Sequence, residues 1–164
     1  MAELAECYAD TLIESELPFD GLFGPAYKGI PLVAAVACAL ANRGLDVPFT
    51  FNRKEAKDHG EGGHLVGAPL QGRIVILDDV LTAGTALREA VDLIEAAGAQ
   101  PTAALLAFDR QERGHGEKST AQELADERQL KVFSIAGLAD LGSWLGDSEH
   151  AADVAAYRTQ WGVE

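Results

Sequence analysis

Cysteine is scarce in this chain of 164 residues, which contains only Cys7 and Cys38. Their spacing matches neither a CxxC redox pair nor a zinc-binding motif, which argues against a dithiol centre and a cysteine-ligated zinc ion. Each cysteine falls within an apolar pattern of helical period. We therefore predict two buried free thiols.

Positive charge is also scarce, because 13 lysines and arginines stand against 26 aspartates and glutamates, which gives a formal net charge of −13. Proteins that bind DNA without regard to its sequence need a broad positive surface that displaces counterions. The composition therefore argues against nucleic acid as a partner. It also implies that any anionic ligand is small and is held locally.

Long hydrophobic runs are missing as well. The longest apolar stretch, residues 30–41, is too short to cross a bilayer and is rich in alanine, so it predicts a buried helix. Met1 is followed by an acidic amphipathic stretch with no basic region and no apolar signal core, so we expect neither export nor membrane association, and we expect a cytoplasmic location. No linker and no internal repeat divides the chain, which predicts one domain over residues 1–164.

Helical and strand patterns alternate along most of the chain. Helices are expected at residues 2–15, 30–42, 86–97 and 120–129 and in the C-terminal region, and strands at residues 21–24, 47–51, 73–77, 102–108 and 131–135. This alternation predicts an α/β fold with a central, mostly parallel sheet flanked by helices. Ligands of such sheets bind outside the carboxyl ends of the strands, so the segments that follow Gly24, Leu77 and Phe108 should converge.

The segment after Leu77 carries the strongest chemical signal. Asp78 and Asp79 are adjacent at the end of an apolar strand, where two unpartnered carboxylates would be costly, so they are expected to face a ligand with hydroxyl groups or a metal-bound polyanion. A vicinal sugar diol fits this description. The turn from Thr82 to Thr85 then opens a helix, whose free N–H groups favour a phosphate. The alternative is an acidic turn with an ordinary threonine N-cap.

Two further segments carry cations. Gly24 and Gly29 flank a turn whose amide groups and Lys28 ammonium could bind a pyrophosphate, although a structural turn with an exposed lysine is the alternative. Residues 52–63 have no apolar period and predict a long, mobile loop, at about residues 53–63, with four potential cations: Arg53, Lys54, Lys57 and His59. Such a loop could close over a diphosphate leaving group, whereas a solvated charge run is the other interpretation.

Four segments, residues 23–31, 52–63, 73–85 and 109–114, resemble the orotate phosphoribosyltransferases of the type I phosphoribosyltransferase family in order and in spacing. The resemblance spans about residues 8–144. The run Arg-Lys-Glu-Ala-Lys-Asp-His-Gly-Glu from Arg53 distinguishes this family from other type I members. Family members carry a Lys-Ser-Gly-Arg-like segment and two aromatic residues before the first helix. This chain begins after that segment, so the family's N-terminal hood is expected to be largely absent.

The resemblance implies the type I phosphoribosyltransferase fold and a role for each motif position. Asp78, Asp79 and Lys57 would be catalytic. Arg53, Lys57 and His59 would reach the donor in a neighbouring subunit of a homodimer, while Lys54 would serve its own. The donor, 5-phosphoribosyl 1-diphosphate, would be bound by Tyr27, Lys28, Arg53, Lys54, Lys57, His59, Asp78, Asp79, Val80, Leu81, Thr82, Ala83, Gly84, Thr85 and Ala86. Orotate would be bound by Thr82 and Arg110.

The implied reaction is the Mg²⁺-dependent transfer of ribose 5-phosphate to orotate, which gives orotidine 5′-phosphate and diphosphate for pyrimidine biosynthesis. No side chain is assigned as a direct metal ligand. A guanidinium–carboxylate pair between Arg110 and orotate is chemically sensible, although a surface arginine at a strand end is the alternative. Transfer to another base, and a non-catalytic regulator on the same fold, are the competing hypotheses.

Overall fold

A single mixed sheet forms the centre of the computed structural model, which describes residues 1–57, 63–114 and 116–163. Within these residues the sheet has six strands in the order β3-β2-β1-β4-β5-β6. All neighbouring pairs are parallel except β2 and β3, which are antiparallel. The strands are β1 (Gly21–Gly24), β2 (Phe49–Lys57), β3 (Gly63–Gly67), β4 (Arg73–Val80), β5 (Gln100–Asp109) and β6 (Lys131–Gly137).

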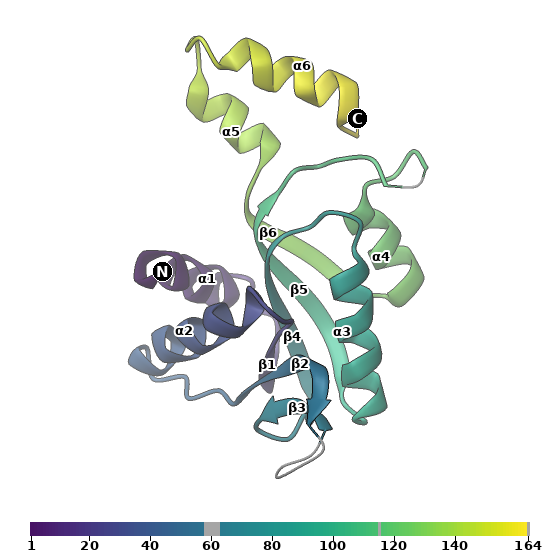
Figure 1. Ribbon diagram of the computed structural model, residues 1–164. Helices are drawn as coiled ribbons and strands as arrows, with labels where there is room; N and C mark the ends of the chain where they lie inside the picture. The colour runs from purple at the N-terminus through teal and green to yellow at the C-terminus, as the bar shows by residue number, and fades with distance from the viewer. Residues whose placement is uncertain (58–62, 115, 164) are drawn as a thin grey trace.

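Helices cover both faces of this sheet (Figure 1). One face carries α1 (Ala2–Glu14) and α2 (Gly29–Asn42), and the other carries α3 (Thr85–Ala96) and α4 (Thr120–Arg128). The chain ends in α5 (Leu138–Leu145) and α6 (Ala151–Trp161). No helix of the described residues has both the length and the apolar character needed to cross a membrane.

The two faces of the sheet have separate hydrophobic cores. Successive side chains of a strand point to opposite faces. In β4, Val75 and Leu77 accordingly pack against α1 and α2, whereas Ile74 and Ile76 pack against α3. Strands buried on both faces explain the unbroken apolar runs in the sequence. The predicted α/β fold with a mostly parallel sheet is therefore confirmed.

Three details differ from the prediction. The strand expected to end at Leu77 continues through Asp78 and Asp79 to Val80 as β4. The expected loop from Arg53 is strand as far as Lys57, and the unpredicted strand β3 pairs antiparallel with it. This pairing supplies backbone partners to a polar segment, which local apolar patterning cannot reveal, and its register shifts between Asn52 and Lys57. The rest of the predicted loop, at residues 58–62, lies outside the described residues.

The prediction of buried thiols is wrong, because Cys7 and Cys38 are both exposed. Helical period alone does not show how wide the buried stripe is: α2 is apolar beyond its buried stripe, and the outer side of α1 is acidic. At 3.6 residues per turn, each cysteine falls on the side of its helix roughly opposite the residues that face the core.

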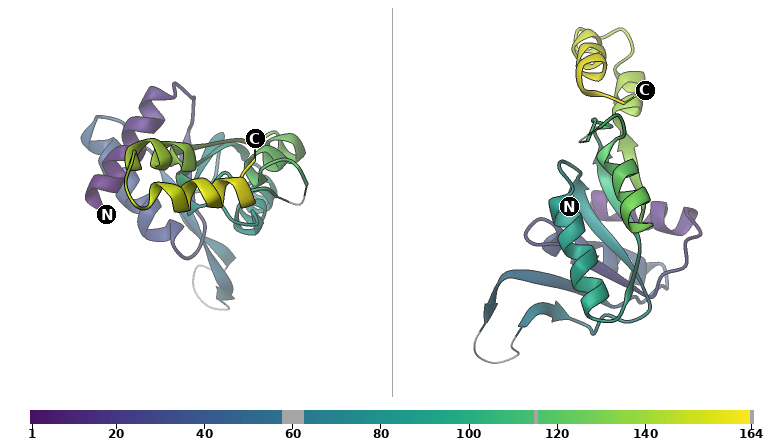
Figure 2. Two further views of the ribbon diagram at one scale, coloured as in Figure 1. Left: turned by 90° about the horizontal axis from the view of Figure 1, so that it is seen from above. Right: turned by 90° about the vertical axis from the view of Figure 1, so that its right-hand side faces the viewer.

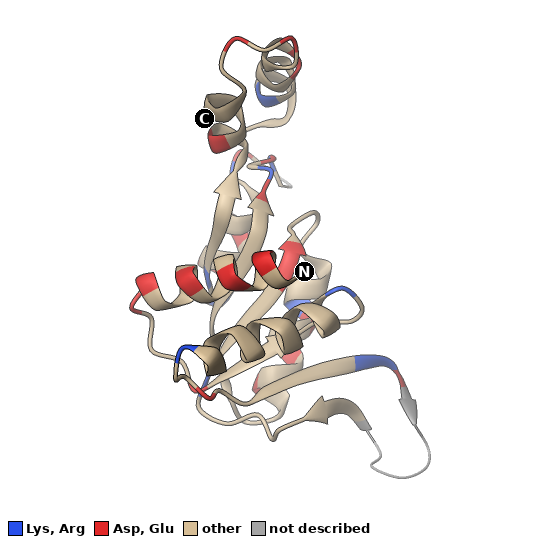
Figure 3. Cartoon of the chain, turned by 90° about the vertical axis from the view of Figure 1, so that its left-hand side faces the viewer, with Lys and Arg blue, Asp and Glu red and all other residues tan. Residues whose placement is uncertain are grey.

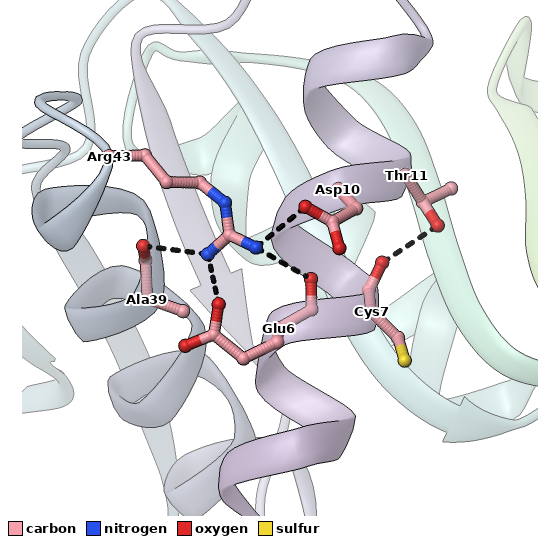
Figure 4. A network of polar contacts seen from close by, with 6 residues as sticks. All are labelled: Glu6, Cys7, Asp10, Thr11, Ala39 and Arg43. Atoms are coloured by element: carbon pink, nitrogen blue, oxygen red, sulfur yellow. Dashed lines mark hydrogen bonds and ion pairs between the residues drawn. The ribbon is translucent and has the colours of Figure 1, made fainter.

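An arginine joins the two helices of one face. The guanidinium of Arg43 bonds to the Glu6 carboxylate, lies 2.6 Å from an Asp10 oxygen, and donates to the Ala39 carbonyl at 3.1 Å (Figure 4). Both carboxylates belong to α1, whose outer side is strongly acidic (Figure 3). This network attaches the end of α2 to α1.

The C-terminal helices stand away from the sheet in both side views (Figures 1 and 2). No residue of α6 is buried, and only Leu138 of α5 is. Two backbone bonds connect the chain end to the segment after β5, from Arg113 N to the Trp161 carbonyl at 2.9 Å and from Val163 N to the Gln111 carbonyl at 3.0 Å. A cavity of about 1050 Å³ lies beside α5 and α6.

Candidate functional site

The turn after β1 and the end of β4 meet through an ion pair. These strands are neighbours in the sheet, so their carboxyl ends lie side by side. The Lys28 ammonium lies 2.7 Å from an Asp79 carboxylate oxygen, and the lysine is more exposed than the half-buried aspartate. The hydrogen bond to Asp79 raises the pKa of Lys28. Two of the predicted segments are thus brought together.

Asp78 occupies a more enclosed environment than its neighbour. Burial, together with the charge of Asp79, raises the pKa of the Asp78 carboxyl from its usual 3.8 to about 6. One of its side-chain oxygens accepts the Asp79 N–H at 3.0 Å. The acidic pair therefore combines a carboxylate that is paired with a lysine and a carboxyl group whose pKa is raised into the mildly acidic range.

A buried tyrosine of α1 supports this strand end. The Tyr8 hydroxyl donates to the Asp78 carbonyl oxygen at 2.7 Å, and the tyrosine is fully buried. Burial, followed by the nearby charges of Asp78 and Asp79, raises the pKa of Tyr8. This contact cannot be predicted from the sequence, because a tyrosine at a core position of a helix follows the same pattern as any other apolar residue.

The loop after β4 ends in an uncapped helix. Gly84 is the N-cap residue of α3, with a left-handed φ of 75°, and no side chain caps the helix. The first N–H groups of α3 therefore remain available to a ligand. A Cβ atom at Gly84 would lie 2.8 Å from Arg88 Nη1 and 2.9 Å from Thr120 Cγ2. Glycine is required here both by the backbone conformation and by the close packing of α4.

A cavity of about 270 Å³ joins these parts. Predicted residues that line it are Lys54, Asp78, Val80, Leu81, Thr82, Gly84, Thr85 and Ala86. Asn52 also lines it and was not predicted; its side-chain oxygen accepts the Ala26 N–H at 2.8 Å, which connects β2 to the turn after β1. Three neighbouring strands thus contribute to one small polar hollow.

The four cationic residues predicted on the loop have different positions in the structure. The Lys54 ammonium lies 5.6 Å from the centre of the exposed Tyr27 ring, so these two residues are brought together. Arg53 is half-buried on β2 and does not line the cavity. Lys57 is the last residue of β2, and His59 lies outside the described residues.

Arg110 stands apart from this hollow. It follows β5 and is not among the residues that line the cavity. Its Nε and Nη2 atoms bond to one Glu112 carboxylate oxygen at 2.9 and 2.5 Å, and the Tyr157 hydroxyl of α6 bonds to the same oxygen. The guanidinium is therefore already paired with a carboxylate of its own chain.

The carboxylates of this site suit a magnesium ion only if a substrate supplies further oxygen ligands. No group of three or more histidine, cysteine, aspartate or glutamate residues is arranged to hold a metal in the part of the chain that the structure describes. Magnesium commonly binds through one or two carboxylates together with substrate phosphates. Asp78 and Asp79 could provide such carboxylates, and the cavity beside them could admit the phosphates.

The α/β fold agrees with a comparison against protein families: residues 3–135 match the family model described as "Phosphoribosyl transferase domain", so the chain is a member of the phosphoribosyltransferase class. The chain is 58% identical over 168 residues to the orotate phosphoribosyltransferase of Thioalkalivibrio sulfidiphilus (strain HL-EbGR7), a match that covers 99% of the chain and 79% of the relative. It is 56% identical to that of Laribacter hongkongensis (strain HLHK9), with 99% and 78% covered.

A solved structure gives the same relationship. The orotate phosphoribosyltransferase of Francisella tularensis superposes with a TM-score of 0.86 at 33% identity, and the match covers 98% of this chain and 79% of that one. The chain therefore belongs to the orotate phosphoribosyltransferase family, as the four sequence segments indicated.

Proposed function

We propose that the chain transfers ribose 5-phosphate from 5-phosphoribosyl 1-diphosphate to orotate, with the release of diphosphate. The observation that carries this proposal is one cavity of about 270 Å³ that is lined by Asp78, the neighbour of Asp79, and by the uncapped N-terminus of α3. Carboxylates suit the hydroxyls of a ribose, and free N–H groups suit its 5-phosphate. The family membership adds orotate as the accepting base.

Each group of residues has a distinct task in this proposal. Asp78 and Asp79 accept hydrogen bonds from the ribose hydroxyls, and the backbone from Val80 to Ala86 holds the 5-phosphate. Lys28, together with Tyr27 and Lys54, faces the diphosphate. Because Lys28 and Asp79 are paired in the free chain, donor binding exchanges this ion pair for contacts from each residue to the donor.

Catalysis then depends mainly on positioning and on charge. Asp78 and Asp79 would hold Mg²⁺ together with the donor, and the ion would supply positive charge that offsets the charge of the diphosphate. Lys57 stabilises the departing diphosphate. Thr82 and Arg110 orient orotate. Arg110 can donate to a substrate carboxylate through Nη1 while its Nε and Nη2 atoms remain bonded to Glu112.

Assembly and location are part of the same proposal. Arg53, Lys57 and His59 serve the donor bound to a second copy of the chain, so the active form is a homodimer. Pyrimidine biosynthesis places the reaction in the cytoplasm. Light scattering of the purified chain tests the assembly, and a strictly monomeric active enzyme would contradict it.

The decisive experiment follows orotate absorbance in the presence of the donor and Mg²⁺. We expect orotate consumption that requires both, and no product from adenine, guanine, xanthine or uracil under the same conditions. Product from one of those bases, but not from orotate, would establish a phosphoribosyltransferase of different specificity. Absence of product from every base, with the donor unbound in calorimetry, would refute the proposal and favour a non-catalytic protein on this fold.

A further inference from the structure

Arg88 lies beside the candidate phosphate loop but outside the cavity. It is in the first turn of α3, and its side chain folds back toward the start of its own helix. Arg88 Nη1 donates to the Ala83 carbonyl oxygen at 2.8 Å. Only 25% of the side chain is exposed. The contact therefore joins a largely enclosed guanidinium to the middle of the loop from Thr82 to Gly84.

The other side of the same guanidinium faces α4. Arg88 Nε donates to a Glu127 carboxylate oxygen at 3.2 Å, and Nη2 lies 3.2 Å from the same oxygen and 3.9 Å from a Glu123 oxygen. These two carboxylates neutralise the arginine and fix its plane. Arg88 is thereby suited to hold the loop rather than to attract an anion itself.

The hydrogen bond from Arg88 to the Ala83 carbonyl oxygen determines the direction of the next backbone N–H group. A trans peptide unit is planar, with its C=O and N–H directed to opposite sides. Fixing the Ala83 carbonyl toward Arg88 therefore also fixes the direction of the Gly84 N–H. Gly84 lines the cavity, and no side-chain cap orders the start of α3. The flanking side chains Thr82 and Thr85 are exposed and do not anchor the loop in the core.

We propose that Arg88 is a positioning residue that preorganises the loop from Thr82 to Gly84 for the donor's 5-phosphate without touching it. This inference rests on the proposed function of the loop. A loop that is ordered before binding loses less conformational entropy when the phosphate arrives. Removing the anchor weakens donor binding, while the chemical step of the bound donor is little changed.

The test compares Arg88→Met with a matched control, Arg128→Met. Methionine retains most of the apolar stem and removes the hydrogen-bonding head. Arg128 is 30% exposed and also joins α3 to α4, through Asp92 at 2.8 Å and Glu95 at 3.8 Å, but the structure gives it no bond to the loop. Both variants lose an ion pair between the same helices, and only one loses the Ala83 contact.

We expect Arg88→Met to raise the KM and Kd for the donor about tenfold, with kcat within about twofold of the wild type, since donor binding must then also order the loop. Arg128→Met should leave the donor KM unchanged at a similar loss of Tm. Arg88→Lys, which can still donate to the Ala83 carbonyl, should restore part of the affinity. An unchanged donor KM in Arg88→Met, or an equal rise in both methionine variants, would overturn the inference.

Amide hydrogen exchange provides a readout that does not depend on activity. Residues 82–84 should exchange faster in Arg88→Met than in the wild type and in Arg128→Met. Equal exchange in all three proteins would refute the anchoring role. If the wild type fails to bind the donor but the loop loosens only in Arg88→Met, the anchor stands and the proposed function of the loop fails.

Discussion

At the scale of single residues, Asp78 shows how a functional group can cost stability. Its pKa is raised to about 6, mainly by burial, so the folded chain favours its neutral form relative to the unfolded chain. The stability contributed by protonation is complete below about pH 4 and is lost as the pH rises through about 6. At neutral pH the Asp78 carboxylate is ionised and therefore opposes folding. The proposed contact with the ribose hydroxyls requires this ionised form.

Asp78→Asn should separate these two roles. Asparagine stays neutral and can still accept the Asp79 N–H. We expect the variant to melt a few degrees higher than the wild type at pH 7.5, with the difference vanishing near pH 4, and to lose at least about tenfold in donor affinity. Calorimetric melting from pH 4 to 8 measures the difference in Tm, and titration with the donor in the presence of Mg²⁺ measures the affinity. A lower Tm at pH 7.5 would contradict the account of burial.

Lys57 is the residue on which we expect turnover to depend most. It ends β2, next to the segment at residues 58–62. Lys57→Ala should reduce kcat at least about 100-fold, the usual cost of removing one group that stabilises developing negative charge, and should leave Tm within about 1 °C. The control is Lys131→Ala, which removes an exposed lysine at the start of β6. Near-normal turnover of Lys57→Ala would refute its catalytic role.

At the scale of elements, the junction of β1 and α2 depends on two glycines in contact. A Cβ atom at Gly24 would lie 2.2 Å from the Gly29 carbonyl oxygen and 2.7 Å from a Val33 methyl group. The Gly29 N–H bonds to the Pro25 carbonyl at 2.9 Å, which closes the turn that carries Lys28. The backbones of strand and helix are therefore too close for any side chain, and this closeness brings Lys28 to Asp79.

Gly24→Ala should destabilise the chain severely, by about 3 kcal/mol or more, because backbone atoms rather than a flexible side chain must move. Gly142→Ala is a matched control. Gly142 lies inside α5, and the nearest atom to its added Cβ would be a Val154 methyl group at 4.0 Å. That change should stabilise the chain by about 0.5–1 kcal/mol. Urea unfolding of both variants checks the prediction, which equal midpoints would disprove.

At the scale of the whole molecule, stability is unevenly distributed. The strands β4 and β5 are buried between two helical layers, whereas α6 buries no residue and stands clear of the sheet (Figure 2). Segments with little buried apolar surface open locally at a small free-energy cost. The α5–α6 pair should therefore behave as a weakly coupled unit attached through residues 111–113.

Hydrogen exchange of the isolated chain should reveal this difference. We expect amides of residues 151–161 to exchange at least about 100-fold faster than those of residues 74–77, since a gap of about 3 kcal/mol in opening free energy corresponds to that ratio. Mass spectrometry of peptides from both regions measures it. Comparable protection of α6 and β4 would show that the terminal helices open only when the whole chain unfolds.

The sequence by itself determined the elements with strong local patterns. The run at residues 73–77 indicates a strand buried on both faces, and the acidic pair was placed at its carboxyl end, because these conclusions depend only on side-chain period and on neighbouring residues. The same local string identified the family. Boundaries were less certain where a polar segment pairs with a distant strand, as at the end of β2.

Only the tertiary structure decided which residues share the site and which face solvent. Asn52 and Lys54 line the cavity because β2 lies beside β1. Tyr8 of α1 bonds to the backbone of Asp78, and Arg88 of α3 bonds to the backbone of Ala83. Cys7 and Cys38 are exposed because only one stripe of each apolar helix meets the sheet. Packing between elements distant in sequence sets these outcomes, and local periodicity carries no record of it.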